Sequence, residues 1–123
     1  MSVNYDLEER TAKFGENIII LCKKIGINDY NKSIINQVIR SATSIGANYM
    51  EANGVASKKD FINKIYICKK ETQETKHWLR MLSTTNEEII EELRFYWKEA
   101  QELTLIFQRI IMSCRKKKEE IEY

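Results

Sequence analysis

The sequence contains no proline and only four glycines among its 123 residues. Sandwiches and barrels need turn-forming residues between many short strands, so this composition disfavours them. Long helices need few turn residues, and a chain of this length is expected to form one domain around a packed core. The composition therefore predicts a single all-α domain that spans residues 1–123.

The sequence also lacks a long apolar run. The longest extends from Ile18 to Cys22, which is much too short to cross a bilayer. The N-terminal residues lack the basic start and apolar segment of a secretion signal. These features predict a cytoplasmic protein with no membrane partner.

Residue types that commonly perform catalysis are scarce. The chain has one histidine, His77, and three widely separated cysteines, all on expected apolar stripes. Buried thiols are therefore expected, and neither a disulfide framework nor a zinc site. A Cys–His pair is not expected, because helical spacing turns His77 and Cys68 to different faces. Since the sequence also has no phosphate-binding glycine loop or nucleophile elbow, we expect no enzymatic activity, metal or cofactor.

The chain is rich in apolar residues at alternating spacings of three and four, the repeat of an amphipathic helix. These stripes occupy four segments with short connections, which predicts an up-down-up-down four-helix bundle. The expected helices cover about residues 6–25, 31–53, 57–83 and 87–118. Asp6 and Asn86 are expected to cap the first and last helices, and Ser57 opens a capping box. Gly26 and Gly54 should end the first two helices.

The second expected helix has few charges on its outer face. Between residues 32 and 51 only Lys32, Arg40 and Glu51 are charged, whereas exposed helix faces usually carry many lysines and glutamates. Gly46 lies in mid-helix, where glycine costs about 1 kcal/mol relative to alanine. Small residues permit close approach either by a helix of the same bundle or by a second subunit. The candidate subunit contacts here are Ser41, Thr43, Ser44, Gly46, Ala47 and Asn48.

The third expected helix has seven basic side chains against three acidic ones. All the basic residues except Lys64 fall within an arc of roughly 120° that contains no acidic residue. This basic arc favours contacts with phosphates, although a purely solvated face is the alternative interpretation. The basic arc consists of Lys58, Lys59, Lys69, Lys70, Lys76 and Arg80, with Arg40 of the second helix as a further candidate contact.

The opposite side of the third helix carries Ile67, Trp78 and Met81, an apolar patch that is a second candidate for subunit contacts. Glu71 and Glu74 lie beside this patch. They are expected to pair with Arg40, Lys64 or Lys70, within or between subunits, because the Glu-x-x-His motifs of a di-metal bundle are absent.

Several of these motifs together resemble the bacterial four-helix-bundle family encoded by intervening sequences of 23S ribosomal RNA genes. That family is similar to the accessory protein of diversity-generating retroelements, a pentameric ring that binds nucleic acid and a reverse transcriptase. The resemblance thus implies a homopentamer, with RNA or DNA and a partner protein such as a reverse transcriptase as candidate partners. The matching residues are Thr43-Ser-Ile-Gly-Ala-Asn48, Glu51-Ala52, Ser57-Lys58, Asp60-Phe61, Lys64, Lys70-Glu71, Glu74-Thr75 and Trp78-Leu79.

The sequence thus favours a non-enzymatic, homo-oligomeric scaffold or accessory protein that binds nucleic acid through the basic arc. The alternative is a protein–protein interaction module, or a mobile-element product, without nucleic-acid binding.

Overall fold

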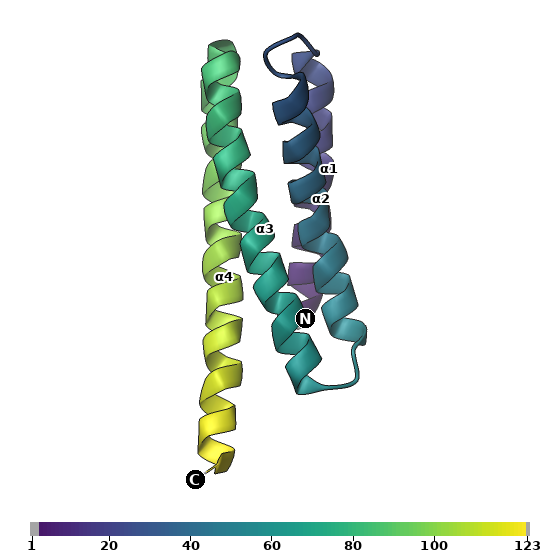
Figure 1. Cartoon of the computed structure of the whole chain (residues 1–123), viewed down its shortest axis with the longest axis vertical. Coiled ribbons are helices and arrows are strands. Elements are labelled where there is room, and N and C mark those ends of the chain that lie inside the picture. Colours follow the sequence, from purple (N-terminus) through teal and green to yellow (C-terminus); the bar gives the residue numbers. More distant parts are fainter. Residues whose placement is uncertain (1–2, 123) are drawn as a thin grey trace.

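The computed structural model describes the backbone of residues 3–122 and the side chains of residues 7–116. Its helices are α1 (Val3–Ile25), α2 (Lys32–Gly54), α3 (Lys58–Thr85) and α4 (Ile90–Glu122), with a 3-10 turn η1 (Glu87–Ile89) before α4. Successive helices run in opposite directions, and α4 extends beyond the other three at its C-terminal end (Figure 1). Residues 3–122 contain no β-strand, so the all-helical prediction is confirmed. No helix in this range is long and apolar enough to cross a membrane.

The apolar stripes meet in one core to which all four helices contribute. Most expected stripe residues are buried. In α4 the main stripe was expected to include Ile110 and Cys114, with Ile111 on a second stripe beside it, and the burial shifts from the first to the second. Ile111 is 1% exposed, whereas Ile110 and Cys114 are only half-buried. An α helix drifts by about 20° per heptad relative to a 3.5-residue repeat, so the buried line moves to the neighbouring position.

Two of the expected helix-end signals are confirmed. Gly26 has φ +76°, the left-handed conformation typical of a helix C-terminus. Ser57 Oγ accepts a hydrogen bond from the Asp60 backbone N–H at 3.1 Å and so caps α3. Helix α1 already begins at Val3, so Asp6 is not its first residue, and the Asp6 side chain lies outside the described residues.

Asn86 was expected to cap the last helix, and this expectation is wrong. The chain first forms η1, and the Asn86 side chain makes no capping hydrogen bond. Its Oδ1 instead accepts a hydrogen bond of 3.1 Å from Asn31 Nδ2. Asn31 is 0% and Asn86 is 6% exposed, so this buried pair links the α1–α2 connection to the α3–α4 connection.

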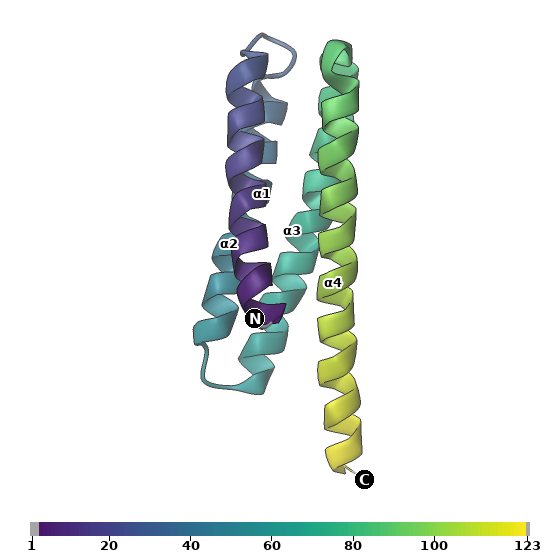
Figure 2. The ribbon, with the colours of Figure 1, turned by 180° about the vertical axis from the view of Figure 1, so that it is seen from behind.

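Helices α1 and α4 face the viewer in Figure 2. Ion pairs between charged side chains connect the two helices. Arg10 donates hydrogen bonds of 2.7 and 2.8 Å to Glu99 and also contacts Glu102. Lys24 contacts Glu92 at 3.1 Å. The hydrogen bonds from Arg10 lower the pKa of Glu99 below its usual value of 4.5. Glu92, Glu99 and Glu102 of α4 are thus turned toward α1.

We expect the Arg10–Glu99 pair to make the free energy of unfolding depend on pH. A lowered folded-state pKa gives stabilisation that is complete above pH 4.5 and is lost as the pH falls through the folded value. Glu99→Gln should therefore reduce the free energy of unfolding by about 1 kcal/mol at pH 7, and by less near pH 3. Urea unfolding at both pH values measures this. Glu91→Gln, which removes an exposed pair with Arg94, should have little effect at either pH. Equal losses for Glu99→Gln at both pH values would contradict the linkage.

Candidate nucleic-acid interface

The structure divides the basic arc into an exposed group and a pair of lysines packed beside α4. Lys69 Nζ donates to Gln108 Oε1 at 2.6 Å, and Lys76 Nζ donates to Gln101 Oε1 at 2.5 Å. Lys76 Nζ also lies 5.2 Å from the centroid of the Trp97 ring, a cation–π arrangement. The exposed group consists of Lys58, Lys59, Lys70 and Arg80.

These contacts continue along the line where α3 meets α4. Toward the α4 C-terminus, the Arg115 guanidinium lies 5.3 Å from the centroid of the Tyr66 ring and contacts its hydroxyl. At about 1.5 Å per residue, the stretch of α3 from Tyr66 to Arg80 is about 21 Å long. Two aromatic rings, each beside a cation, and further cations therefore line one surface, which we name the α3–α4 seam. The seam consists of Tyr66, Lys69, Lys76 and Arg80 of α3 and Arg94, Trp97, Gln101, Gln108 and Arg115 of α4.

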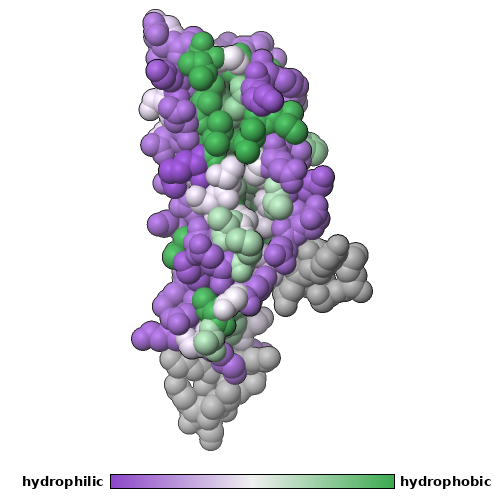
Figure 3. Space-filling model, turned by 90° about the vertical axis from the view of Figure 1, so that its right-hand side faces the viewer, coloured by the Kyte–Doolittle hydropathy of each residue, from purple (hydrophilic) through white to green (hydrophobic). Residues whose placement is uncertain are grey.

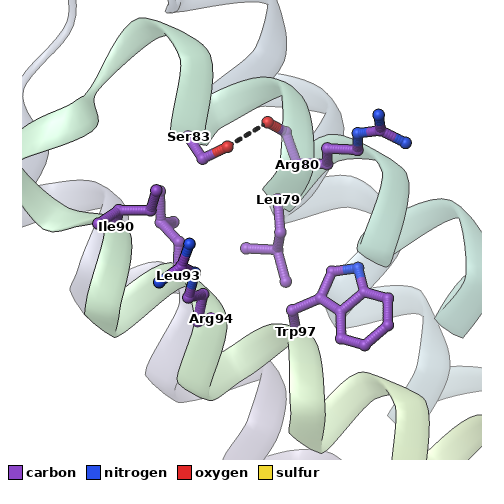
Figure 4. A pocket seen from close by; sticks show the side chains of 7 residues that line it. All are labelled: Leu79, Arg80, Ser83, Ile90, Leu93, Arg94 and Trp97. Carbon is purple, nitrogen blue, oxygen red and sulfur yellow. Dashed lines mark hydrogen bonds between the residues drawn. The ribbon is translucent and has the colours of Figure 1, made fainter.

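A hollow of about 250 Å³ opens at the Arg80 end of the seam (Figure 4). Leu79 points into it from α3, and Trp97 forms one side from α4, whereas Arg80 extends away from its centre. Trp97 is 39% exposed, while Leu79 and Leu93 are buried and form an apolar floor. None of its lining residues is acidic. They are Leu79, Arg80, Ser83, Ile90, Leu93, Arg94 and Trp97.

Arg40 lies apart from the basic arc. Its Nη1 contacts Glu71 Oε2 at 3.0 Å, and its Nη2 contacts Glu74. Glu71 is only 5% exposed, so Arg40 neutralises a buried carboxylate. The expected pairing of both glutamates with Arg40 is therefore confirmed, and it occurs within one chain. Lys64 pairs with Glu51 at 2.6 Å instead.

The small residues of α2 fall into two sets. Ser41 is 0% exposed and accepts a hydrogen bond of 2.9 Å from Thr75, so its side chain lies inside the bundle and is not available to a second subunit. A Cβ at Gly46 would lie 3.4 Å from the backbone of Thr11, so this glycine permits the close approach of α1. A larger residue at Gly46 would therefore disturb the packing of α1 on α2 as well as any subunit contact. Ser44 and Asn48 are half-buried, and Thr43 and Ala47 are exposed.

Thr43, Gly46 and Ala47 line a groove of about 320 Å³ between α1 and α2, together with residues such as Ile19 and Met50. Ile19 is 38% and Met50 is 60% exposed. Figure 3 shows a strip of apolar and weakly polar side chains along the α1–α2 side of the molecule, bordered by hydrophilic side chains. Residues of both α1 and α2 line this groove, including Glu8 and Glu16 of α1.

The apolar patch of α3 is only half exposed. Ile67, Trp78 and Met81 each retain some accessible surface, and Trp78 packs against the core. Trp78 Nε1 is buried and has no hydrogen-bond acceptor among the described residues. A buried indole N–H usually finds an acceptor, so this unpaired group is an exception among the buried polar atoms of the described residues.

Two of the three thiols expected to be buried, Cys22 and Cys68, are buried, whereas Cys114 is half-buried. Burial raises the pKa of Cys22 to about 11 and that of Cys68 to about 12. Both thiols are therefore protonated at neutral pH. Because only the thiolate is nucleophilic, neither is expected to react readily. His77 is exposed and its ring contacts Trp78, with 4.8 Å between the ring centroids.

The seam contains three cations or rings that the sequence did not single out: Arg94, Arg115 and Trp97. The charges of the last helix, taken as a whole, give no basic surplus, because its glutamates offset its basic residues. The signal lies in their separation, since Glu92, Glu99 and Glu102 face α1. A helical wheel of α4 that marked the side facing α3 would have revealed this separation of basic from acidic side chains.

Known proteins support the family suggested by the motifs. A search of the curated proteins gave no match. Among solved structures, the chain is similar to a protein of unknown function from the S23 ribosomal protein family of Bacteroides thetaiotaomicron VPI-5482. The two are 32% identical, with a TM-score of 0.80, and the alignment covers 89% of this chain and 97% of that one. The family model described as 23S rRNA-intervening sequence protein matches residues 4–109. Since that match covers most of the sequence, the chain belongs to the family of 23S rRNA-intervening sequence proteins.

Proposed function

We propose that this protein is a non-enzymatic, homo-oligomeric scaffold that binds nucleic acid along the α3–α4 seam. The observation that supports this most strongly is the placement of Lys76 over the Trp97 ring, within a row of cations and rings about 21 Å long. Proteins that hold nucleic-acid strands combine such a positive track with aromatic rings on which bases stack.

The charges of the seam are available to phosphates. Lys69 and Lys76 hydrogen-bond to neutral amides, which leave their positive charge uncompensated. Arg94 pairs with Glu91 at 3.1 Å, but both side chains are more than 60% exposed. Such a pair contributes only about 0–1 kcal/mol, so a phosphate can replace the glutamate. Three glutamates of α4, Glu92, Glu99 and Glu102, pair with cations of α1, so the seam keeps a net positive field despite a formal net charge of only +2.

Salt-dependent binding of an oligonucleotide tests this proposal. Contacts to the phosphates of one seam are expected to give a Kd of about 10⁻⁴–10⁻⁶ M, and several seams in one oligomer would strengthen it. Fluorescence anisotropy with labelled RNA and DNA strands should show log K falling linearly with log salt. An oligomer that retains no strand even at low salt would favour the protein-interaction alternative.

The α1–α2 groove and the Trp78 patch are the surfaces that we propose for self-association. Monomeric proteins rarely leave large apolar strips in contact with water, and the Trp78 N–H lacks an acceptor among the described residues. The assembly that we propose is the ring of five copies that the resemblance in the sequence implies. A closed ring would require each copy to present two different surfaces to its neighbours.

Charged residues in the groove should therefore split the oligomer. Ile19→Glu with Met50→Glu places carboxylates on two exposed side chains, so the monomer should fold normally while association is lost. Light scattering should show a fall from about five chains to one, with an unchanged helical circular dichroism spectrum. Leu105→Glu, an equivalent change at a 45% exposed position on α4, is the control. A double variant with the wild-type mass would exclude the groove as the interface.

A further inference from the structure

We infer that the hollow at the Arg80 end of the α3–α4 seam holds one unpaired nucleobase, so that the protein prefers single strands to duplexes. This inference rests on the proposed function of the same seam. It goes further in naming the class of nucleic acid and the side chain on which the base stacks.

The size and lining of the hollow fit one flat heterocycle. Its volume of about 250 Å³ is below the range of about 300–1,000 Å³ typical of pockets for drug-sized ligands. The floor is apolar, and one side is the indole of Trp97, which is 39% exposed. Stacking on an exposed ring strengthens binding by about 5- to 150-fold per base, for any base. Lys76 contacts the same ring from outside the hollow, since it is not a lining residue, so both contacts are compatible.

The charges at the rim fit the strand that would carry this base. Arg80 on α3 and Arg94 on α4 border the hollow from opposite helices, and both are exposed. Arg80 extends outward from the hollow, as Figure 4 shows, so its guanidinium can reach a phosphate while the base occupies the centre. Arg94 forms an exposed pair with Glu91, which a phosphate can displace.

A duplex cannot use the hollow in the same way. Its bases are paired and stacked, and extruding one of them costs energy that single strands do not have to supply. A duplex would therefore contact only the cations of the seam. The proposal predicts a difference in affinity that depends on the base and not on the number of phosphates.

The test compares three ligands of equal phosphate content at one salt concentration: a 12-nucleotide single strand, the same strand with abasic sites throughout, and a duplex. The ordinary strand should bind about 10-fold more tightly than the other two. Trp97→Leu should remove this advantage without changing the affinity for the abasic strand. Ser83→Leu, which fills the hollow and keeps the indole, should have the same effect. Phe95→Leu, which removes a 67% exposed ring of α4 that does not line the hollow, is the control and should preserve the advantage.

A Trp78→Phe variant supplies a direct readout, because Trp97 is then the only tryptophan. Its fluorescence should be quenched by the ordinary strand and unchanged by the abasic one. Equal affinities for the ordinary and abasic strands would overturn the base-binding hollow and leave the phosphate-binding seam standing. Absence of binding to all three ligands at low salt would overturn both proposals.

Discussion

Reversing four charges of the basic arc should abolish nucleic-acid binding. The variant combines Lys69→Glu, Lys70→Glu, Lys76→Glu and Arg80→Glu. It removes up to four phosphate contacts, and each contributes about 0.7 to the slope on a single strand, so the slope of log K against log salt should become shallower by about 3. Repulsion between the new carboxylates and phosphates should reduce the affinity further, by roughly three orders of magnitude in total at low salt. Anisotropy titrations over a range of salt concentrations measure both quantities.

The bundle should tolerate these reversals. The partners of Lys69 and Lys76 are the amides of Gln108 and Gln101. An amide can donate as well as accept, so it can bond to a glutamate in place of a lysine. The matched control reverses Lys13, Lys23, Lys24 and Lys32, four exposed cations outside the seam. Both variants have the same net charge. Equal loss of binding in the two variants would show that total charge, and not the seam, determines affinity.

Removing the Arg40 guanidinium should be the most destabilising change at any partly exposed position of the bundle. Arg40→Met leaves the carboxylate of Glu71, which is 5% exposed, buried beside Glu74 without a cation. Breaking a buried ion pair costs about 3–5 kcal/mol, and because the Arg40 side chain is 48% exposed we expect a loss of about 2–3 kcal/mol. Urea unfolding at pH 7 measures the loss.

The double variant Arg40→Met/Glu71→Leu identifies the cause. It replaces both charges with apolar groups of similar shape, so it should recover most of the lost stability. If the double variant is as unstable as Arg40→Met, the buried charge is not responsible. Folded Arg40→Met protein should bind oligonucleotides as the wild type does, because Arg40 is held by two carboxylates away from the basic arc.

The helices of this protein could be predicted from its sequence because each one has a local signature. The spacing of residues such as Phe14 and Ile18 defines a buried stripe, and both are at most 1% exposed. The stop at Gly26 and the cap at Ser57 depend on neighbours only a few residues away. The shift from Ile110 to Ile111 could not be read in the same way, because it accumulates over several turns of α4.

Only the α3 side of the proposed binding surface could be predicted from the sequence, because the rest depends on which helices are neighbours. The basic arc is a property of α3 alone and is visible on a helical wheel. The contact between Lys76 and Trp97 joins residues on separate helices, as does the pair of Arg40 with Glu71. A mid-helix glycine such as Gly46 fits either an internal contact or an external one. Only the position of Thr11 in space shows that α1 uses it.

The buried pair of asparagines at the connections fixes the axial alignment of the two halves of the bundle. Asn31 Nδ2 donates to Asn86 Oδ1 and also to the Gly26 carbonyl, each at 3.1 Å. If the α1–α2 hairpin slid along the α3–α4 hairpin by one helical turn of about 5.4 Å, the bond between the two amides would be lost, whereas the bond to Gly26 lies within one hairpin and would remain. Apolar residues at a repeating interval would tolerate such a slip far better. The amide hydrogens around these two connections should therefore exchange with solvent about as slowly as those of the core, although loops usually exchange fast.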